Sequence, residues 1–238
     1  MTRLALRPRS DAQRNLKLRT TLKRYYALMA RRYGPTGWWP GDTPFEIAVG
    51  AILTQNTAWR NVEKAIANLK AARLLTPHAI VGAPVAVLES ALRPSGYFRV
   101  KARRLRAFCA HLDVKYGGSM KRMARRPLPA LREELLAIHG IGPETADDIL
   151  LYACGHPVFV VDAYTRRLLV RHGHAEPEIR YEAMRALFEN HLDADLNLFR
   201  EYHALIVYTG KDHCRSKPNC DGCPLAPTLR AGEPHSVE

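Results

Sequence analysis

Apolar residues recur at every third or fourth position along most of this chain, which is the spacing of amphipathic helices. One segment, residues 45–55, is almost wholly apolar and predicts a helix buried on most of its sides. The apolar run at 158–161 is too short to build a sheet. We therefore expect an all-α fold with about ten helices. The clearest predicted helices are 16–33, 45–55, 58–75, 97–112, 163–173, 178–192 and 196–210, the last ended by Gly210.

The rest of the chain is organised around residues 135–162. Positions 139–142 form a turn between two helical patterns, and Pro143 suits the first turn of the second helix. The two glycines of the turn allow positive φ and a close approach to a partner, and Ile141 is expected to pack between the helices. Amides at the start of the second helix favour an anion such as one phosphate. The pattern predicts a helix-hairpin-helix that binds a nucleic-acid backbone without reading its sequence.

The charge of the chain points to a polyanionic partner. Lys and Arg number 36 against 23 Asp and Glu, which gives a net charge of +13 and a pI near 9.8. Such a field attracts nucleic acid, although a merely soluble basic protein has the same balance. Basic residues without acids gather at 99–106 and at 121–126, and such clusters suit phosphate neutralisation.

The amino-terminal segment and the hydropathy suggest a cellular location. No run of about 18 apolar residues is present, so we expect no membrane-spanning helix. Residues 1–20 are basic and lack the apolar stretch of a signal peptide. Residues 1–15 are expected to form a flexible basic arm. The expected location is cytoplasmic and nucleoid-associated.

Three segments resemble the endonuclease III-like helix-hairpin-helix DNA glycosylase superfamily (HhH-GPD). They are WWPGDTPFE at 38–46, FEIAVGAILTQNTAWRNVEKAIANL at 45–69 and GIGPETADDILLYACGHPVFVVDAYTRRLL at 140–169. With the cysteine-rich end, the likeness covers roughly residues 30–225. The first segment is typical of the endonuclease III-related branch, which includes 3-methyladenine glycosylases. The resemblance implies two helical lobes with the hairpin and the acid at a cleft: a six-helix barrel at 44–154 containing the hairpin at 133–154, and a terminal-ends lobe from 16–43 and 155–238.

The resemblance also implies which residues do the chemistry. Asp162 matches the family's catalytic aspartate, whose carboxylate stabilises the positive charge that builds on the sugar of a flipped nucleotide and orients water. Asp162 also stands where it can cap the next helix, and the two roles are compatible. Glu144 occupies the position where bifunctional members carry the lysine that forms a Schiff base, so we expect a monofunctional enzyme. The residues that match the family's backbone-binding hairpin are Gly140, Ile141, Gly142 and Thr145.

Further matches concern the flipped base. Gln55 matches the glutamine that fills the space left by the flipped nucleotide. The expected base pocket consists of Trp38, Trp39, Pro40 and Phe45. Aromatic faces suit a positively charged alkylated purine such as 3-methyladenine. The adjacent tryptophans could equally anchor a loop on the core, because tryptophan is costly to expose.

A cysteine-rich loop near the end of the chain raises the question of a metal. Its three cysteines are spaced C-x5-C-x2-C: Cys214, Cys220 and Cys223. The family's iron-sulfur loop is C-x6-C-x2-C-x5-C, and the expected fourth position here is Leu229. His213 and His235 are conceivable substitutes without support from spacing. Since a 4Fe-4S cluster normally takes four thiolates, a cluster, a zinc site and a metal-free loop all stay open.

The expected function is that of a monofunctional base-excision-repair DNA glycosylase, acting as a monomer on double-stranded DNA that contains a damaged base. Alkylated adenine is the first expectation for the lesion. One alternative is a bifunctional glycosylase/AP lyase that acts on oxidised pyrimidines through another lysine. A second is a non-catalytic helix-hairpin-helix DNA-binding protein whose acid is only a helix cap.

Overall fold

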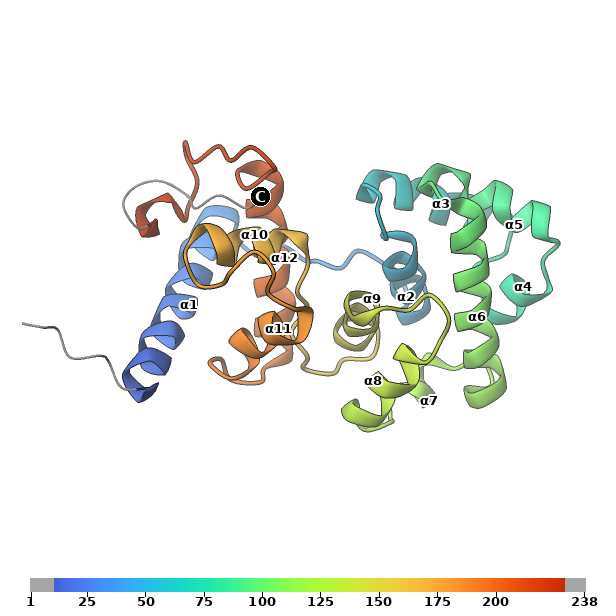
Figure 1. Ribbon diagram of the computed structural model, residues 1–238. Coiled ribbons are helices and arrows are strands. Elements are labelled where there is room, and N and C mark those ends of the chain that lie inside the picture. Colours follow the sequence, from blue (N-terminus) through green and yellow to red (C-terminus); the bar gives the residue numbers. More distant parts are fainter. Residues whose placement is uncertain (1–10, 230–238) are drawn as a thin grey trace, which may run out of the picture. The chain divides into compact units, whose positions relative to one another are not determined.

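The computed structural model describes residues 11–229, and these residues form helices and no strand, as the apolar spacing predicts. They divide into two compact units (Figure 1). One unit joins the chain up to Thr36 with the chain from Val161 onward, and the other is Gly37–Val160. None of the helices between residues 11 and 229 has the length and hydropathy of a membrane span.

The first unit contains helices from both ends of the chain: α1 (Asp11–Tyr33), α10 (Ala163–Arg171), α11 (Tyr181–Glu189), α12 (Leu196–Asp212) and the 3-10 turn η3 (Ala226–Thr228). Its core includes Leu22 of α1 and Tyr202 of α12, whose hydroxyl donates to the Leu22 carbonyl at 2.8 Å. Helix α1 begins at Asp11 rather than at residue 16, so residues 11–15 of the expected arm are helical. Residues 1–10 lie outside the described residues.

Helix α12 continues through Gly210, contrary to the expectation that this glycine ends it. A Cβ at Gly210 would lie 2.5 Å from Cγ and 2.7 Å from Cβ of Tyr164 on α10. The absent side chain therefore allows α10 and α12 to pack closely. Gly210 is therefore a packing residue inside a helix. Glycine has a low helix propensity, and the close packing of the two helices offsets that cost in stability.

The second unit contains α2 (Pro44–Leu53), α3 (Trp59–Ala71), α4 (Pro77–Gly82), α5 (Val85–Leu92), the 3-10 turn η1 (Arg93–Ser95), α6 (Phe98–Tyr116), α7 (Met120–Met123), α8 (Leu128–Leu136), α9 (Pro143–Asp148) and the π-helical turn η2 (Ile149–Ala153). In α2, every residue from Phe45 to Leu53 except Ile47 is buried, so its apolar sequence is confirmed as that of a core helix.

The unit boundaries differ from the expected lobe boundaries at 43/44 and 154/155. The second unit extends at both ends, from Gly37 to Val160. At its start, the segment before α2 packs through its tryptophans and Asp42 against α3. At its end, the residues 158–160 are buried. Contacts of these flanking segments, rather than helix ends, set the limits of the unit.

Candidate active site and nucleic-acid interface

The hairpin turn at 139–142 joins α8 to α9 in the second unit. Gly140 has φ +82°, a left-handed conformation that favours glycine. Gly142 is instead extended, with φ −90° and ψ 177°, and is the N-cap residue of α9. Gly140 thus uses the positive φ that glycine allows, whereas Gly142 is extended, as is usual for a residue before proline. Ile141 is 4% exposed, as its predicted packing requires.

The first turn of α9 contains Glu144 and Thr145. Glu144 is exposed, and an acid at a helix start interacts favourably with the helix dipole. Thr145 is buried, and its hydroxyl accepts a hydrogen bond from Gln55. Any contact of Thr145 with DNA would therefore fall to its backbone rather than to its side chain.

Gln55 lies against the hairpin turn. It follows α2 directly after the C-cap residue Thr54. Its Nε2 donates to the carbonyl of Gly140 at 3.2 Å and to Oγ1 of Thr145 at 2.9 Å, and its Oε1 accepts from Nη1 of Arg104. The structure thus joins Gln55, Gly140 and Thr145, which the sequence assigns to DNA contact. Arg104 joins them without having been predicted, because nothing in the sequence distinguishes it from the other basic residues of α6.

The tryptophans belong to a four-ring aromatic cluster in the second unit. Trp38 and Trp39 both contact Trp59, with ring centroids 5.0 and 5.3 Å apart, and Trp39 contacts Tyr152 at 5.2 Å. Trp59 and Tyr152 were not predicted, because helical periodicity does not tell which helices meet. The only sequence signal for them is that large aromatic rings on neighbouring helices tend to bury together.

The other two residues expected to line a base pocket are Pro40 and Phe45. Pro40 is exposed, and Phe45 is buried in the first turn of α2. Pro40 follows Trp39 directly in the chain. The tight packing of the tryptophan rings also agrees with the alternative that they anchor a loop.

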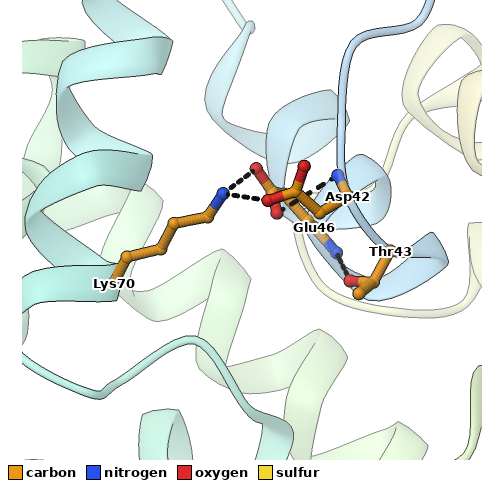
Figure 2. A network of polar contacts seen from close by, with 4 residues as sticks. All are labelled: Asp42, Thr43, Glu46 and Lys70. Carbon is orange, nitrogen blue, oxygen red and sulfur yellow. Dashed lines mark hydrogen bonds and ion pairs between the residues drawn. The ribbon is translucent and has the colours of Figure 1, made fainter.

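A polar network holds the tryptophan-bearing segment to the adjoining helices (Figure 2). Thr43 is the N-cap residue of α2, and its Oγ1 accepts from the backbone N–H of Glu46 at 3.1 Å. The side chain of Lys70, on α3, reaches Asp42 and Glu46, with Nζ 2.8 Å from a carboxylate oxygen of each. These hydrogen bonds raise the pKa of Lys70. The network fixes the start of α2 against α3.

The basic residues of α6 do not all face solvent. Arg99 and Arg103 are exposed, but Lys101 is 1% exposed and its Nζ donates to the carbonyls of Leu53 at 2.9 Å and Ser95 at 2.6 Å. Burial lowers the pKa of Lys101 to about 8. The predicted basic face is thus only partly correct, because Lys101 satisfies a carbonyl at the end of α2 instead.

Asp162 lies in the first unit as the N-cap residue of α10. Its Oδ1 accepts from the backbone N–H of Thr165 at 2.7 Å and from the Thr165 hydroxyl at 2.8 Å, which confirms the capping role. Its side chain is 13% exposed, and Nε2 of His203 on α12 lies 3.9 Å from Oδ2. Burial lowers the pKa of His203, which keeps this imidazole neutral near pH 7. One carboxylate oxygen is therefore fixed by the cap, while the other faces a neutral ring.

His203 was not predicted as a neighbour of Asp162. It lies within the apolar pattern of 196–210, where a polar residue has to be buried. The position of His203 in an apolar pattern predicts that the histidine is buried. It does not predict the partner, because the partner depends on how α10 and α12 pack together.

The cysteine loop surrounds a small cavity in the first unit. The cavity has a volume of about 20 Å³ and is lined by the three cysteines together with Arg171, His213 and Leu229, among others. Arg171 donates to Sγ of Cys214 at 3.1 Å and to the carbonyl of Ser216 at 2.8 Å. Burial raises the pKa of the Cys223 thiol. Protein contacts thus hold this loop against α10.

The residues of the loop do not fit a 4Fe-4S cluster. Leu229 replaces the fourth cysteine, and in the part of the chain that the structure describes no three His, Cys, Asp or Glu side chains are arranged to hold a metal ion. His235 lies outside the described residues.

The chain is similar to proteins of DNA repair. The family profile described as HhH-GPD superfamily base excision DNA repair protein matches residues 49–193. A Methanocaldococcus jannaschii protein named as a candidate DNA repair glycosylase is 44% identical over 202 residues, which cover 84% of this chain and 91% of that protein. Endonuclease III of Thermotoga maritima is 29% identical over 184 residues, which cover 76% of this chain and 79% of that protein.

Solved structures share the fold. The H. pylori 3-methyladenine DNA glycosylase (MagIII) bound to 1,N6-ethenoadenine matches with a TM-score of 0.68 and 31% identity, covering 82% of this chain and 97% of that one. A trapped endonuclease III-DNA covalent intermediate matches with a TM-score of 0.76 and 24% identity, covering 90% of this chain and 96% of that one. The second likeness concerns the fold alone.

Proposed function

The chain belongs to the HhH-GPD superfamily of base-excision DNA repair proteins, and we propose that it is a monofunctional DNA glycosylase that releases an alkylated purine from double-stranded DNA. Membership makes it a DNA glycosylase, a hydrolase of N-glycosyl bonds; the lesion, the monofunctional chemistry and action as a monomer are the proposed parts. The observation that carries the proposal is the carboxylate of Asp162, which Thr165 holds in one orientation at the start of α10.

The hairpin supplies the grip on the DNA strand. A Cβ at Gly142 would meet no heavy atom within 4 Å, so space is open beside the turn for a phosphate. Backbone N–H groups at such a turn attract anions, and they do not discriminate between sequences. The net charge of +13 adds a general attraction for the duplex. The residues in this role are Gly140, Ile141, Gly142 and the backbone of Thr145.

Asp162 supplies the negative charge that the reaction needs. The bond between C1′ and the base nitrogen breaks, its electron pair leaves with the base, and positive charge builds on the sugar. A carboxylate held nearby stabilises that charge without having to reorganise. The oxygen of a water molecule then bonds to C1′, and the proton that this water loses passes to Asp162 and on to solvent. A neutral His203 does not cancel the carboxylate charge.

The proposed absence of a lyase step rests on Glu144. A Schiff base forms when an amine attacks the sugar carbon. Glu144 is an acid at the position where the family's bifunctional members carry that amine. The products are therefore a free base and an intact strand with an abasic site.

The choice of an alkylated purine rests on the aromatic cluster and on one relative. Trp38 and Trp39 are half-buried, so part of each residue is accessible. A positively charged base is attracted to the faces of such rings, and it leaves as a neutral molecule that needs no acid to protonate it. The 31% identical H. pylori structure is named as a 3-methyladenine DNA glycosylase bound to 1,N6-ethenoadenine, which supports the same class of lesion.

Duplexes that each carry one lesion, incubated with and without alkali, test the proposal. We expect strand breaks at 3-methyladenine only after alkali, because a monofunctional enzyme leaves the abasic strand uncut. Strand breaks without alkali at oxidised pyrimidines would favour the bifunctional alternative. The similarity to endonuclease III is the observation that favours this alternative. Binding without release of any base would favour the non-catalytic alternative.

A further inference from the structure

Arg104 of α6 lies across the hairpin turn. A Cβ on Gly140 would be 2.6 Å from Cδ and 2.7 Å from Nε of Arg104, so the turn leaves room for this side chain only because residue 140 is glycine. Arg104 donates to Oε1 of Gln55, and Nε2 of Gln55 donates back to the carbonyl of Gly140 and to the hydroxyl of Thr145. These four residues close a ring of contacts, which we call the Gln55 latch.

The latch engages both ends of the Gln55 amide. A glutamine amide has two N–H donors and one carbonyl acceptor; here the nitrogen donates to two groups of the hairpin and the oxygen accepts from Arg104. Ordering a free glutamine side chain costs conformational entropy. In the latch the Gln55 side chain is already ordered before DNA binds, so binding costs less conformational entropy.

We propose that Arg104 is a positioning residue for Gln55: it holds that side chain on the turn that grips the strand. Gripping the strand and filling the gap left by a flipped base then become one coupled event. The inference rests on the proposed function, because such a gap exists only where a nucleotide leaves the duplex. The preceding residue, Arg103, has the same charge and is exposed, so it provides a matched control for the loss of one positive charge.

A double-mutant cycle on gap recognition tests the latch. The measurement is the ratio of affinities for a duplex with a stable abasic-site analogue and for the same duplex intact, at one salt concentration. We expect Arg104→Ala and Gln55→Ala each to lower this ratio about tenfold, the size of one hydrogen bond to a charged donor. The double variant should lose no more than Gln55→Ala alone, since both changes break the same contact. Arg103→Ala should weaken both affinities alike and leave the ratio as in the unchanged protein.

Two results would overturn the inference: an unchanged ratio in Arg104→Ala, or losses that simply add in the double variant. Arg104→Lys keeps the charge and most of the stem but lacks the planar, forked guanidinium, so it should lower the ratio too. If Arg104→Ala unfolds below the assay temperature, the Arg104→Lys variant is used for the same comparison. Base release is followed in parallel. If the protein releases a base but the losses in the double-mutant cycle add, only the proposed role of Arg104 is contradicted. If the losses do not add but no base is released, only the proposed enzyme activity is contradicted.

Discussion

The helices α9 and α10 begin in opposite ways. The N-cap residue of α9 is Gly142, which has no capping side chain. The N-cap residue of α10 is Asp162, whose carboxylate bonds to Thr165. A helix start without a cap leaves N–H groups and space for an outside anion, whereas a carboxylate cap satisfies its own helix and presents a negative charge. The first arrangement suits a phosphate and the second a sugar that becomes positively charged.

Removing the charge at the α10 cap should have the largest effect. Asp162→Asn keeps a good capping side chain, so the free energy of unfolding should change by less than about 1 kcal/mol. Base release should fall about 10²- to 10³-fold, the range seen when one electrostatic stabiliser is removed. Single-turnover release measures the loss, and DNA affinity should be retained. Release at the unchanged rate would show that the carboxylate is only a cap.

Giving α9 the kind of cap that α10 has should weaken DNA binding. Gly142→Asp is compatible with the observed φ of −90° and open surroundings. It should place a negative charge where the phosphate is proposed to bind and lower duplex affinity about tenfold, while leaving the fold intact. Fluorescence anisotropy at fixed salt measures the affinity. Gly142→Asn is the control with a similar cap and no charge; an equal loss in both variants would exclude charge as the cause.

Changing the first turn of α9 should alter the chemistry by a smaller amount. Glu144→Lys places an amine where the resemblance to bifunctional members implies the Schiff-base lysine, and reversal of the charge should raise duplex affinity several-fold. We expect a fraction of this variant to be trapped on lesion-containing DNA by borohydride, which the unchanged protein should not be. Glu144→Gln controls for the lost acid. Trapping of the unchanged protein would point to another lysine as a nucleophile.

The neighbour of the α10 cap should give the smallest effect, visible in the pH dependence of stability. Burial lowers the pKa of His203 below its usual 6.5. As pH falls below 6.5, the unfolded chain binds the proton before the folded protein does, so the free energy of unfolding decreases. His203→Gln should reduce this slope by up to about 1.4 kcal/mol per pH unit. Denaturant unfolding between pH 5 and 7 measures it, and an unchanged slope would mean that His203 titrates normally.

Local signals predicted several parts of this molecule correctly. The apolar run at 45–55 forms most of the buried helix α2, which ends at Leu53, and the position of Asp162 before a helical pattern is that of an N-cap. The positive φ of Gly140 followed from its place in a short turn between helices. Gly210 misled the prediction, because a glycine that ends a helix and one that admits a neighbouring ring look alike in the sequence.

The helical class, the hairpin and the family could be predicted from the sequence, because these depend on periodicity, turn residues and motifs that lie close together in the chain. Three pairings became visible only in the folded protein: Arg104 meets Gln55 on the hairpin turn, Trp59 packs against the two tryptophans, and His203 faces Asp162. These pairs join residues that lie far apart in the chain. Periodicity specifies which face of a helix is buried, but the partner of each face is chosen by packing of the whole unit.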